Sequence, residues 1–216
     1  MKVKVAADIL GANDMIAAGN RAVFKENGVF VINVMSSPGA GKTTLLEKTL
    51  VALKDKYRIG VIEGDVATTA DADRIEKLGI PVVQINTGSA CHLDGSMVRN
   101  AMGEFDLKAL DLMIVENVGN LVCPAEFNVG EDCKVMLLSC AEGDDKPLKY
   151  PLMFHESRAL VINKIDLIPY TNFSLEKAVK DSLSINPKLE VFPLSCRTGE
   201  GLDAWLGWLS GNMRTA

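Results

Sequence analysis

The chain has 216 residues, of which 48% are hydrophobic and 24% are charged, and its formal net charge is -5. This length suits one α/β domain with a substantial core and leaves no room for a second large domain. An acidic balance without a run of Lys and Arg argues against nucleic acid or an anionic membrane as the main partner. Without a membrane-length apolar stretch or a signal-peptide core, we expect a cytoplasmic protein.

The first predicted element is an amphipathic helix over residues 8–26, which Asn27-Gly28 ends. We expect residues 1–28 to form a helical extension that packs at the edge of a sheet. The apolar run over residues 29–35 then predicts a buried parallel strand, and a helix-forming segment begins at Leu45.

A glycine-rich turn lies between this strand and this helix. Strand, turn, Gly-Lys-Thr and helix make a phosphate cradle, in which backbone N–H groups and Lys42 hold phosphates and the Thr43 hydroxyl ligates Mg²⁺. Ser36 replaces the first glycine of the usual G-x-x-x-x-G-K-[ST] pattern, but the chemistry depends on Gly41, Lys42 and Thr43. The predicted nucleotide-binding residues here are Pro38, Gly39, Ala40, Gly41, Lys42, Thr43 and Thr44.

Two further strands end in acidic residues. The strand over residues 58–63 leads into a turn with Asp65 and Asp71, which are candidates for Mg²⁺, for the attacking water or simply for a helix cap. The strand over residues 110–115 delivers Glu116-Asn117-Val118-Gly119, the form of a γ-phosphate sensor. In that interpretation Glu116 acts through Mg²⁺, directly or through water, and the Gly119 N–H meets the phosphate; the alternative is an ordinary strand end with a turn glycine.

The second half of the chain carries a signal for the base. Strands over residues 134–140 and 159–162 lead to Asn163-Lys164-Ile165-Asp166, where the Asp166 carboxylate accepts two hydrogen bonds that guanine offers and adenine does not. After the last strand, residues 187–193, the segment Ser195-Cys196-Arg197 resembles the final base-contacting loop of GTPases. A helix over residues 199–209 closes the domain, with its tryptophans in the core.

Five cysteines in a reducing compartment are buried small side chains, metal ligands or reactive thiols rather than a disulfide framework. Cys91 and Cys123 follow the carboxyl ends of the strands over residues 81–86 and 110–115, and Cys91 adjoins His92, so we assign them a functional role. The other three, Cys133, Cys140 and Cys196, are predicted to be buried.

With these motifs in place, the chain resembles, over nearly its whole length, the HypB family of hydrogenase nickel-incorporation GTPases, a dimerising group that also contains UreG. The most specific parts of the match are residues 37–43, 86–88, 91–94, 116–124, 145–151 and 163–166. The resemblance implies a three-layer P-loop NTPase fold with a mostly parallel central sheet and helices on both faces, in a single domain over residues 1–216.

The resemblance also implies the ligands and partners. Cys91, His92 and Cys123 would bind Ni²⁺ or Zn²⁺ at a dimer interface, and Thr43, Asp71 and Glu116 would hold Mg²⁺. The implied partners are a second copy of the chain, a HypA-type metallochaperone and a hydrogenase large-subunit precursor. One chain supplies three thiolate or imidazole ligands, too few to close a site, whereas a twofold dimer could combine two sets.

We therefore predict a GTP-hydrolysing metallochaperone for [NiFe] hydrogenase whose catalytic residues are Lys42, Thr43, Asp71 and Glu116. Turnover should be slow, because no arginine finger stands out beyond the weak candidates Arg74 and Arg99. GTP would order the loop that carries Cys123 and favour the dimer, and hydrolysis would release the metal. The alternatives are an accessory GTPase for another metallocentre such as urease, and a metal carrier in which GTP only controls dimerisation.

Overall fold

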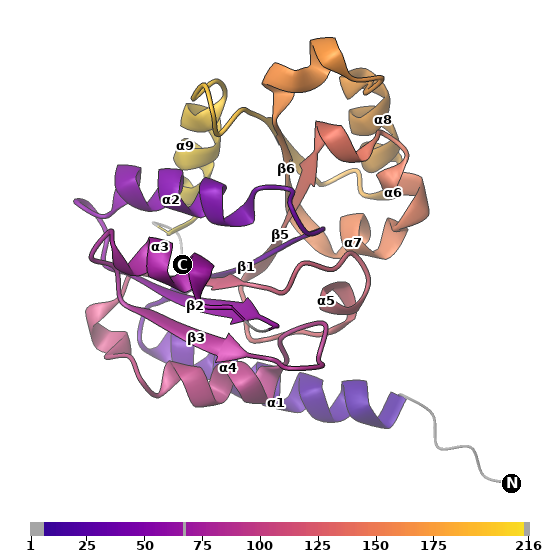
Figure 1. The fold of residues 1–216 in the computed structure, drawn as a ribbon. Coiled ribbons are helices and arrows are strands. Elements are labelled where there is room, and N and C mark those ends of the chain that lie inside the picture. The colour runs from indigo at the N-terminus through magenta and orange to yellow at the C-terminus, as the bar shows by residue number, and fades with distance from the viewer. Residues whose placement is uncertain (1–6, 67, 214–216) are drawn as a thin grey trace, which may run out of the picture.

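The computed structural model describes residues 7–66 and 68–213 (Figure 1). Within these residues seven strands form one sheet in the order β3-β2-β4-β1-β5-β6-β7, and each neighbouring pair is parallel. The strands are β1 (Phe30–Ser36), β2 (Ile59–Asp65), β3 (Val82–Asn86), β4 (Leu112–Glu116), β5 (Cys133–Ser139), β6 (Ser157–Asn163) and β7 (Glu190–Pro193). The predicted α/β architecture with a mostly parallel sheet is confirmed.

Helices cover both faces of this sheet (Figure 1). The α-helices are α1 (Ala7–Glu26), α2 (Lys42–Leu53), α3 (Ala70–Glu76), α4 (Gly95–Met102), α5 (Cys123–Glu126), α6 (Lys146–Lys149), α7 (Pro151–Glu156), α8 (Leu175–Ile185) and α9 (Leu202–Met213). Short 3-10 helices span Leu107–Ala109, Cys140–Glu142 and Ile165–Tyr170. The sequence motifs do not predict α5 to α8, and α2 begins earlier than predicted, at Lys42, so three of the predicted nucleotide-binding residues lie in its first turn.

The central strands are buried, and mostly apolar, along nearly their whole length because both of their faces are covered. In β1, Phe30, Ile32 and Val34 pack with the buried side of α2 and with Trp205 of α9, whereas Val31 faces the cluster that includes Phe24 of α1. As predicted, Trp205 is a core residue: it is fully buried, and its indole N–H donates to Thr49 Oγ1 at 3.0 Å. These layers hold the strand ends, and the loops that follow them, in fixed relative positions.

The N-terminal helix α1 lies on a face of the sheet and not at its edge, which corrects the predicted position. It packs mainly along α4 (Figure 1) and also contacts β1, a central strand. The buried Phe24 of α1 shares a hydrophobic cluster with Val31 of β1. Asn20 Nδ2 donates to the carbonyl oxygens of Gly95 and Val129, so α1 also joins the start of α4 to the loop before β5. The part of the predicted 1–28 extension that comprises residues 1–6 lies outside the described residues.

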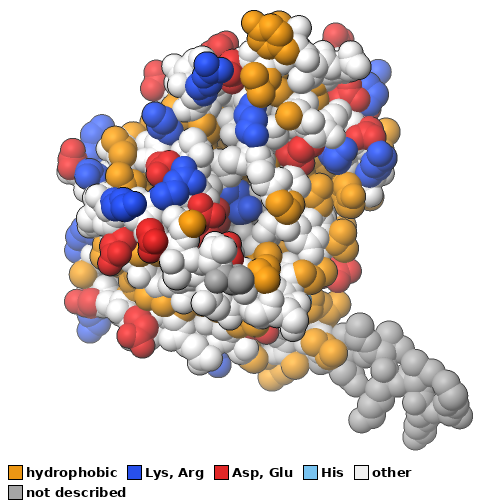
Figure 2. Space-filling model, viewed as in Figure 1, with side chains coloured by type: hydrophobic (Ala, Val, Ile, Leu, Met, Phe, Trp, Pro, Cys, Tyr) orange, Lys and Arg blue, Asp and Glu red, His pale blue; other side chains and the backbone are white. Residues whose placement is uncertain are grey.

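The surface seen in Figure 2 intermingles acidic and basic side chains over α2, α3 and α6. Among residues 7–66 and 68–213, no helix combines the length and the apolar character that a membrane span requires.

Candidate nucleotide and metal sites

The strand order brings the predicted phosphate-binding loops together. β1 stands between β4 and β5, and the carboxyl ends of parallel strands meet at one edge of the sheet, where open α/β sheets bind ligands. The loops after β1, β2 and β4 line one pocket of about 530 Å³ there. The predicted residues in its wall are Pro38, Gly39, Gly41, Lys42, Thr43, Thr44, Asp71, Glu116, Gly119 and Lys164.

The phosphate loop has the backbone that its glycines allow. Gly39 and Gly41 have φ angles of 76° and 104°, in the left-handed region that favours glycine. Lys42 Nζ donates to Ser36 Oγ at 3.1 Å, so the serine that replaces the consensus glycine contacts the predicted catalytic lysine. Lys164 Nζ donates to the carbonyl oxygen of Gly39 at 2.7 Å, which ties the base-recognition segment to the loop.

Three carboxylates face one another in this pocket. One oxygen from each of Glu63, Asp71 and Glu116 lies within 4.8 Å of the others, and Thr43 Oγ1 donates to Glu116 Oε1 at 2.9 Å. Burial raises the pKa of both Glu63 and Glu116, and for Glu63, whose pKa rises to about 11, the nearby charge of Glu116 adds to the effect. One oxygen of each of these two glutamates is buried without a hydrogen-bond partner.

This donor set fits a hard divalent cation, because Mg²⁺ prefers oxygen ligands and would satisfy the unpaired oxygens. Glu63 is the member that the sequence prediction missed. The detectable signal was its position near the end of β2, and the tertiary structure adds that Glu63 pairs in register with Glu116 of β4. Asp65 also lines the pocket but is not one of these three carboxylates, and its Oδ1 accepts a hydrogen bond from the Thr68 N–H at 2.9 Å.

The two arginine-finger candidates differ in position. Arg74 lines the phosphate pocket, where its guanidinium pairs with Glu47 at 2.6 Å and with Asp71 at 3.2 Å. Arg99 instead donates to Asn20 Oδ1 and to the carbonyl oxygen of Ile16, so it fastens α4 to α1. Arg74 is therefore the candidate that lies at the nucleotide pocket, and it is already engaged by two carboxylates.

The predicted base-binding residues meet in a neighbouring hollow of about 480 Å³. Its wall includes Asn163, Lys164, Asp166, Cys196 and Arg197, together with Gly41 and Thr44 of the phosphate loop. The Asp166 carboxylate accepts a hydrogen bond from Ser195 Oγ at 2.6 Å and lies 3.9 Å from the Arg197 guanidinium.

The Asn163 side chain braces two loops. Its Nδ2 donates to the carbonyl oxygen of Ala40 at 3.0 Å, and its Oδ1 accepts from the Cys196 N–H at 3.1 Å. Asn163 thus joins the phosphate loop to the base loop.

The predicted soft-metal ligands also lie together. Cys91 Sγ is 3.0 Å from Cys123 Sγ and 3.8 Å from His92 Nδ1, and the ligand atoms of all three residues lie within 4.8 Å of one another. The pKa of Cys123 is raised by its hydrogen bond with Cys91, and burial lowers the pKa of His92, which favours the neutral imidazole that binds metals. The three side chains can therefore offer two sulfurs and one nitrogen to a single ion.

Neighbouring residues orient these ligands. The His92 ring stacks on Phe127 with the ring centroids 3.9 Å apart. Asn120 Nδ2 donates to the carbonyl oxygen of Cys91 at 3.2 Å, and Asn120 Oδ1 accepts from the Val122 N–H at 2.9 Å, which links the two ligand loops. The other cysteines, Cys133, Cys140 and Cys196, are buried as predicted.

Comparison with known proteins identifies the family of this chain. Residues 30–193 match the CobW/HypB/UreG nucleotide-binding domain. The hydrogenase maturation factor HypB of Escherichia coli K12 is 48% identical over 207 residues, which cover 96% of this chain and 71% of that protein. The hydrogenase/urease maturation factor HypB of Helicobacter hepaticus is 44% identical over 204 residues, which cover 93% of this chain and 84% of that protein.

A solved structure extends the agreement to the fold. The crystal structure of HypB from Helicobacter pylori in complex with nickel superposes with a TM-score of 0.89 at 41% identity, and the match covers 94% of this chain and 96% of that one. The resemblance found in the motifs is confirmed. The chain belongs to the CobW/HypB/UreG family and is a relative of the hydrogenase maturation factors HypB.

Proposed function

We propose that this chain hydrolyses GTP and binds nickel, which it holds and releases during the maturation of [NiFe] hydrogenase. The observation that carries the proposal is the 3.0 Å separation of Cys91 Sγ and Cys123 Sγ beside His92, at the sheet edge that also carries the phosphate loop. The loop that leads to Cys123 begins with Glu116 and Gly119, the predicted phosphate sensor. The nickel complex of the Helicobacter pylori relative supports nickel as the ion.

Hydrolysis would use the residues that line the phosphate pocket. Backbone N–H groups at the start of α2 and Lys42 would hold the phosphates, and Asp166 would select guanine. Thr43, Asp71 and Glu116, joined by Glu63, would hold Mg²⁺, which would neutralise charge on the phosphates. Turnover should be slow, because Arg74 is already paired with Glu47 and Asp71.

The nucleotide would control the metal through a homodimer. Cys91, His92 and Cys123 supply three ligands, so a second chain related by a twofold axis would complete the coordination or bridge a pair of ions. GTP would favour the arrangement of residues 116–123 that assembles this site, and hydrolysis would weaken it. A HypA-type metallochaperone and a hydrogenase large-subunit precursor would then exchange nickel with the dimer in the cytoplasm.

The test is nickel affinity and stoichiometry with GDP, with a non-hydrolysable GTP analogue and without nucleotide. Cys91→Ala and Cys123→Ala should each abolish tight binding. The matched control is Cys133→Ala, which removes a buried thiol at the first residue of β5, the end of that strand that faces away from the carboxyl edge of the sheet. Nickel affinity that ignores the nucleotide, or that survives in both ligand variants, would contradict the proposal.

A second experiment distinguishes a role that needs GTP hydrolysis from simple metal carriage. Lys42→Ala should abolish both hydrolysis and hydrogenase activation. If delivery continued in this variant, the chain would be a metal carrier in which the nucleotide only controls dimerisation.

Service to urease is a second candidate function, favoured by the name of the Helicobacter hepaticus relative. Activation of an apo-urease and of an apo-hydrogenase by the same nickel-loaded chain would discriminate the two. We expect the hydrogenase to be activated in preference.

A further inference from the structure

The residue that follows the predicted sensor glutamate has a fully buried side chain with three polar contacts. Asn117 Oδ1 accepts hydrogen bonds from the Leu93 N–H and from the Val118 N–H, both at 3.0 Å. Asn117 Nδ2 donates to Asn33 Oδ1 of β1 at 3.1 Å. A buried amide satisfied in this way fixes the relative positions of the segments that it joins, because losing any one bond leaves a polar group unpaired.

These segments belong to different parts of the mechanism. Val118 precedes Gly119, whose Cα lies so near the phosphate loop that an added Cβ would be 3.0 Å from Pro38 N. Leu93 directly follows the metal ligand His92. Since β3 and β4 are separated in the sheet by β2, the loop after β3 meets the sensor through side chains and not through strand pairing.

The Leu93 side chain has no space in which to change its conformation, so it cannot absorb a displacement of its own backbone. Its side chain is fully buried against Gly64 of β2, where an added Cβ would lie 2.7 Å from Leu93 Cγ. A shift of the Leu93 backbone must therefore be taken up by the loop that carries Cys91 and His92.

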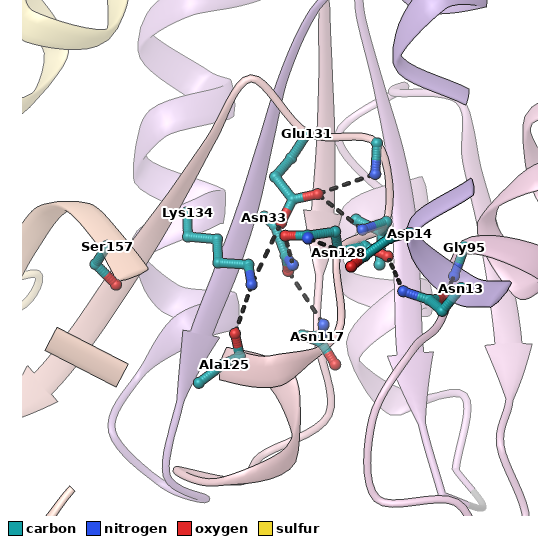
Figure 3. Close-up of polar contacts among 12 residues, drawn as sticks. Asn13, Asp14, Asn33, Gly95, Asn117, Ala125, Asn128, Glu131, Lys134 and Ser157 are labelled. Carbon is teal, nitrogen blue, oxygen red and sulfur yellow. Dashed lines mark hydrogen bonds and ion pairs between the residues drawn. The ribbon is translucent and has the colours of Figure 1, made fainter. Parts of the chain in front are cut away.

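From the Nδ2 end of the Asn117 amide, a chain of polar contacts leads to Ala125 (Figure 3). Asn33 Nδ2 donates to Glu131 Oε1 at 3.4 Å, and Glu131 Oε1 lies 3.9 Å from Lys134 Nζ. Lys134 Nζ donates in turn to the carbonyl oxygen of Ala125 at 2.6 Å. Ala125 lies in α5, the short helix that begins at Cys123.

We propose that Asn117 is the positioning residue that couples the nucleotide state of residues 116–119 to both metal-ligand loops. The hydrogen bond to Leu93 transmits a shift of residues 116–119 to Cys91 and His92. The contacts through Asn33, Glu131 and Lys134 hold the helix of Cys123 in place, so that Cys91 and His92 move relative to Cys123. This inference rests on the proposed function, because it assumes that the nucleotide controls metal affinity.

The experiment measures the nickel dissociation constant of the full chain with GDP and with a non-hydrolysable GTP analogue. Nickel binding is monitored through the thiolate-to-nickel absorption band. Asn117→Leu removes the polar contacts at nearly constant volume, whereas Asn117→Asp keeps an acceptor for the Leu93 and Val118 N–H groups. The control is Asn128→Ala, which removes an exposed bond to Asp14 at the edge of the same network.

In the wild type we expect the ratio of the two constants to lie in the range of about 5- to 150-fold that is typical of coupled sites. In Asn117→Leu the ratio should fall to within about twofold of unity while both nucleotides still bind; Asn117→Asp should retain most of it, and Asn128→Ala all of it. A wild-type ratio that persists in Asn117→Leu overturns this inference and leaves the proposed function intact. A ratio near unity in the wild type overturns both.

A measurement on the wild type covers the case in which Asn117→Leu does not fold. The NMR signals of the Leu93 N–H and of the Asn117 side-chain NH₂ should shift together when GDP is replaced by the analogue, and shift again when Zn²⁺ is added. Signals that stay in place on both additions overturn the inference.

Discussion

Lys134 is a buried cation whose removal should destabilise the fold strongly. Its side chain is 5% exposed and that of Glu131 is 3% exposed, and burial lowers the pKa of Lys134 while the nearby Glu131 opposes this shift. Lys134→Met keeps the length of the side chain but leaves Glu131 without its counter-charge and the Ala125 carbonyl oxygen without its donor.

Removing one partner of a buried ion pair costs about 3–5 kcal/mol. Glu131 keeps the N–H donors of Val129 and Gly130, at 2.8 and 2.9 Å, so we expect the lower end of this range, about 3 kcal/mol. For a domain of this size each kcal/mol lowers the melting temperature by about 2–4 °C, so the variant should melt about 6–12 °C lower.

The assay is urea and thermal unfolding of the protein freed of nucleotide and metal. Lys177→Met is the control, because Lys177 also pairs with a carboxylate, Asp144 at 2.9 Å against 3.9 Å for Lys134 and Glu131, but does so on the surface. This variant should melt close to the wild type. Glu131→Gln added to Lys134→Met should recover part of the loss by removing the unpaired charge. Equal melting of the two lysine variants, or a double variant no more stable than Lys134→Met, would refute the reasoning.

Three further predictions concern the nucleotide side of the molecule. Because the pKa of Glu63 is raised in the metal-free fold beside Glu116, the folded state holds a proton that the unfolded state releases. With a chelator present to remove metal, the free energy of unfolding should therefore fall by about 1.4 kcal/mol per pH unit between pH 6 and 8, relative to the Glu63→Gln variant. If the wild type and Glu63→Gln had the same pH dependence, Glu63 and Glu116 would not form a buried pair. Asp166→Asn should bind GTP weakly and prefer xanthosine triphosphate in a competition assay. Unchanged nucleotide selectivity would mean that Asp166 does not contact the base. Gly64→Ala should lower the free energy of unfolding, measured in urea, by about 1–3 kcal/mol, because the added methyl group overpacks against Leu93. Adding Leu93→Val should restore part of this loss. If Gly64→Ala left the stability unchanged, the contact between residues 64 and 93 would be loosely packed.

Local motifs made much of this site predictable. The phosphate loop is consecutive in the chain, and its geometry follows from Gly39 and Gly41 together with the strand and helix that flank them. Asp166 stands out for the same reason, since Asn-Lys-x-Asp follows a strand. The continuous apolar runs of the central strands then predict a parallel sheet with both faces covered, whose carboxyl edge must collect these loops.

Other features were invisible in the sequence because they depend on contacts between distant segments. Glu63 looks like an ordinary strand residue until the register of β2 and β4 places it beside Glu116. Lys134 and Glu131 look like surface charges, yet both are buried. Helix α1 was expected at an edge, because amphipathicity shows that one side is covered but not by which part of the sheet.

The sequence by itself determined the family, and it predicted the phosphate cradle, the base-selecting carboxylate and the three soft-metal ligand candidates, because each is encoded in a few adjacent residues whose backbone and side-chain chemistry is local. Only the tertiary structure decided that Cys91 and Cys123 have their sulfurs 3.0 Å apart, and that Asn117 joins the sensor to the loop of His92. These contacts depend on the order and register of strands that are far apart in the chain, and strand order is a property of the packed sheet as a whole.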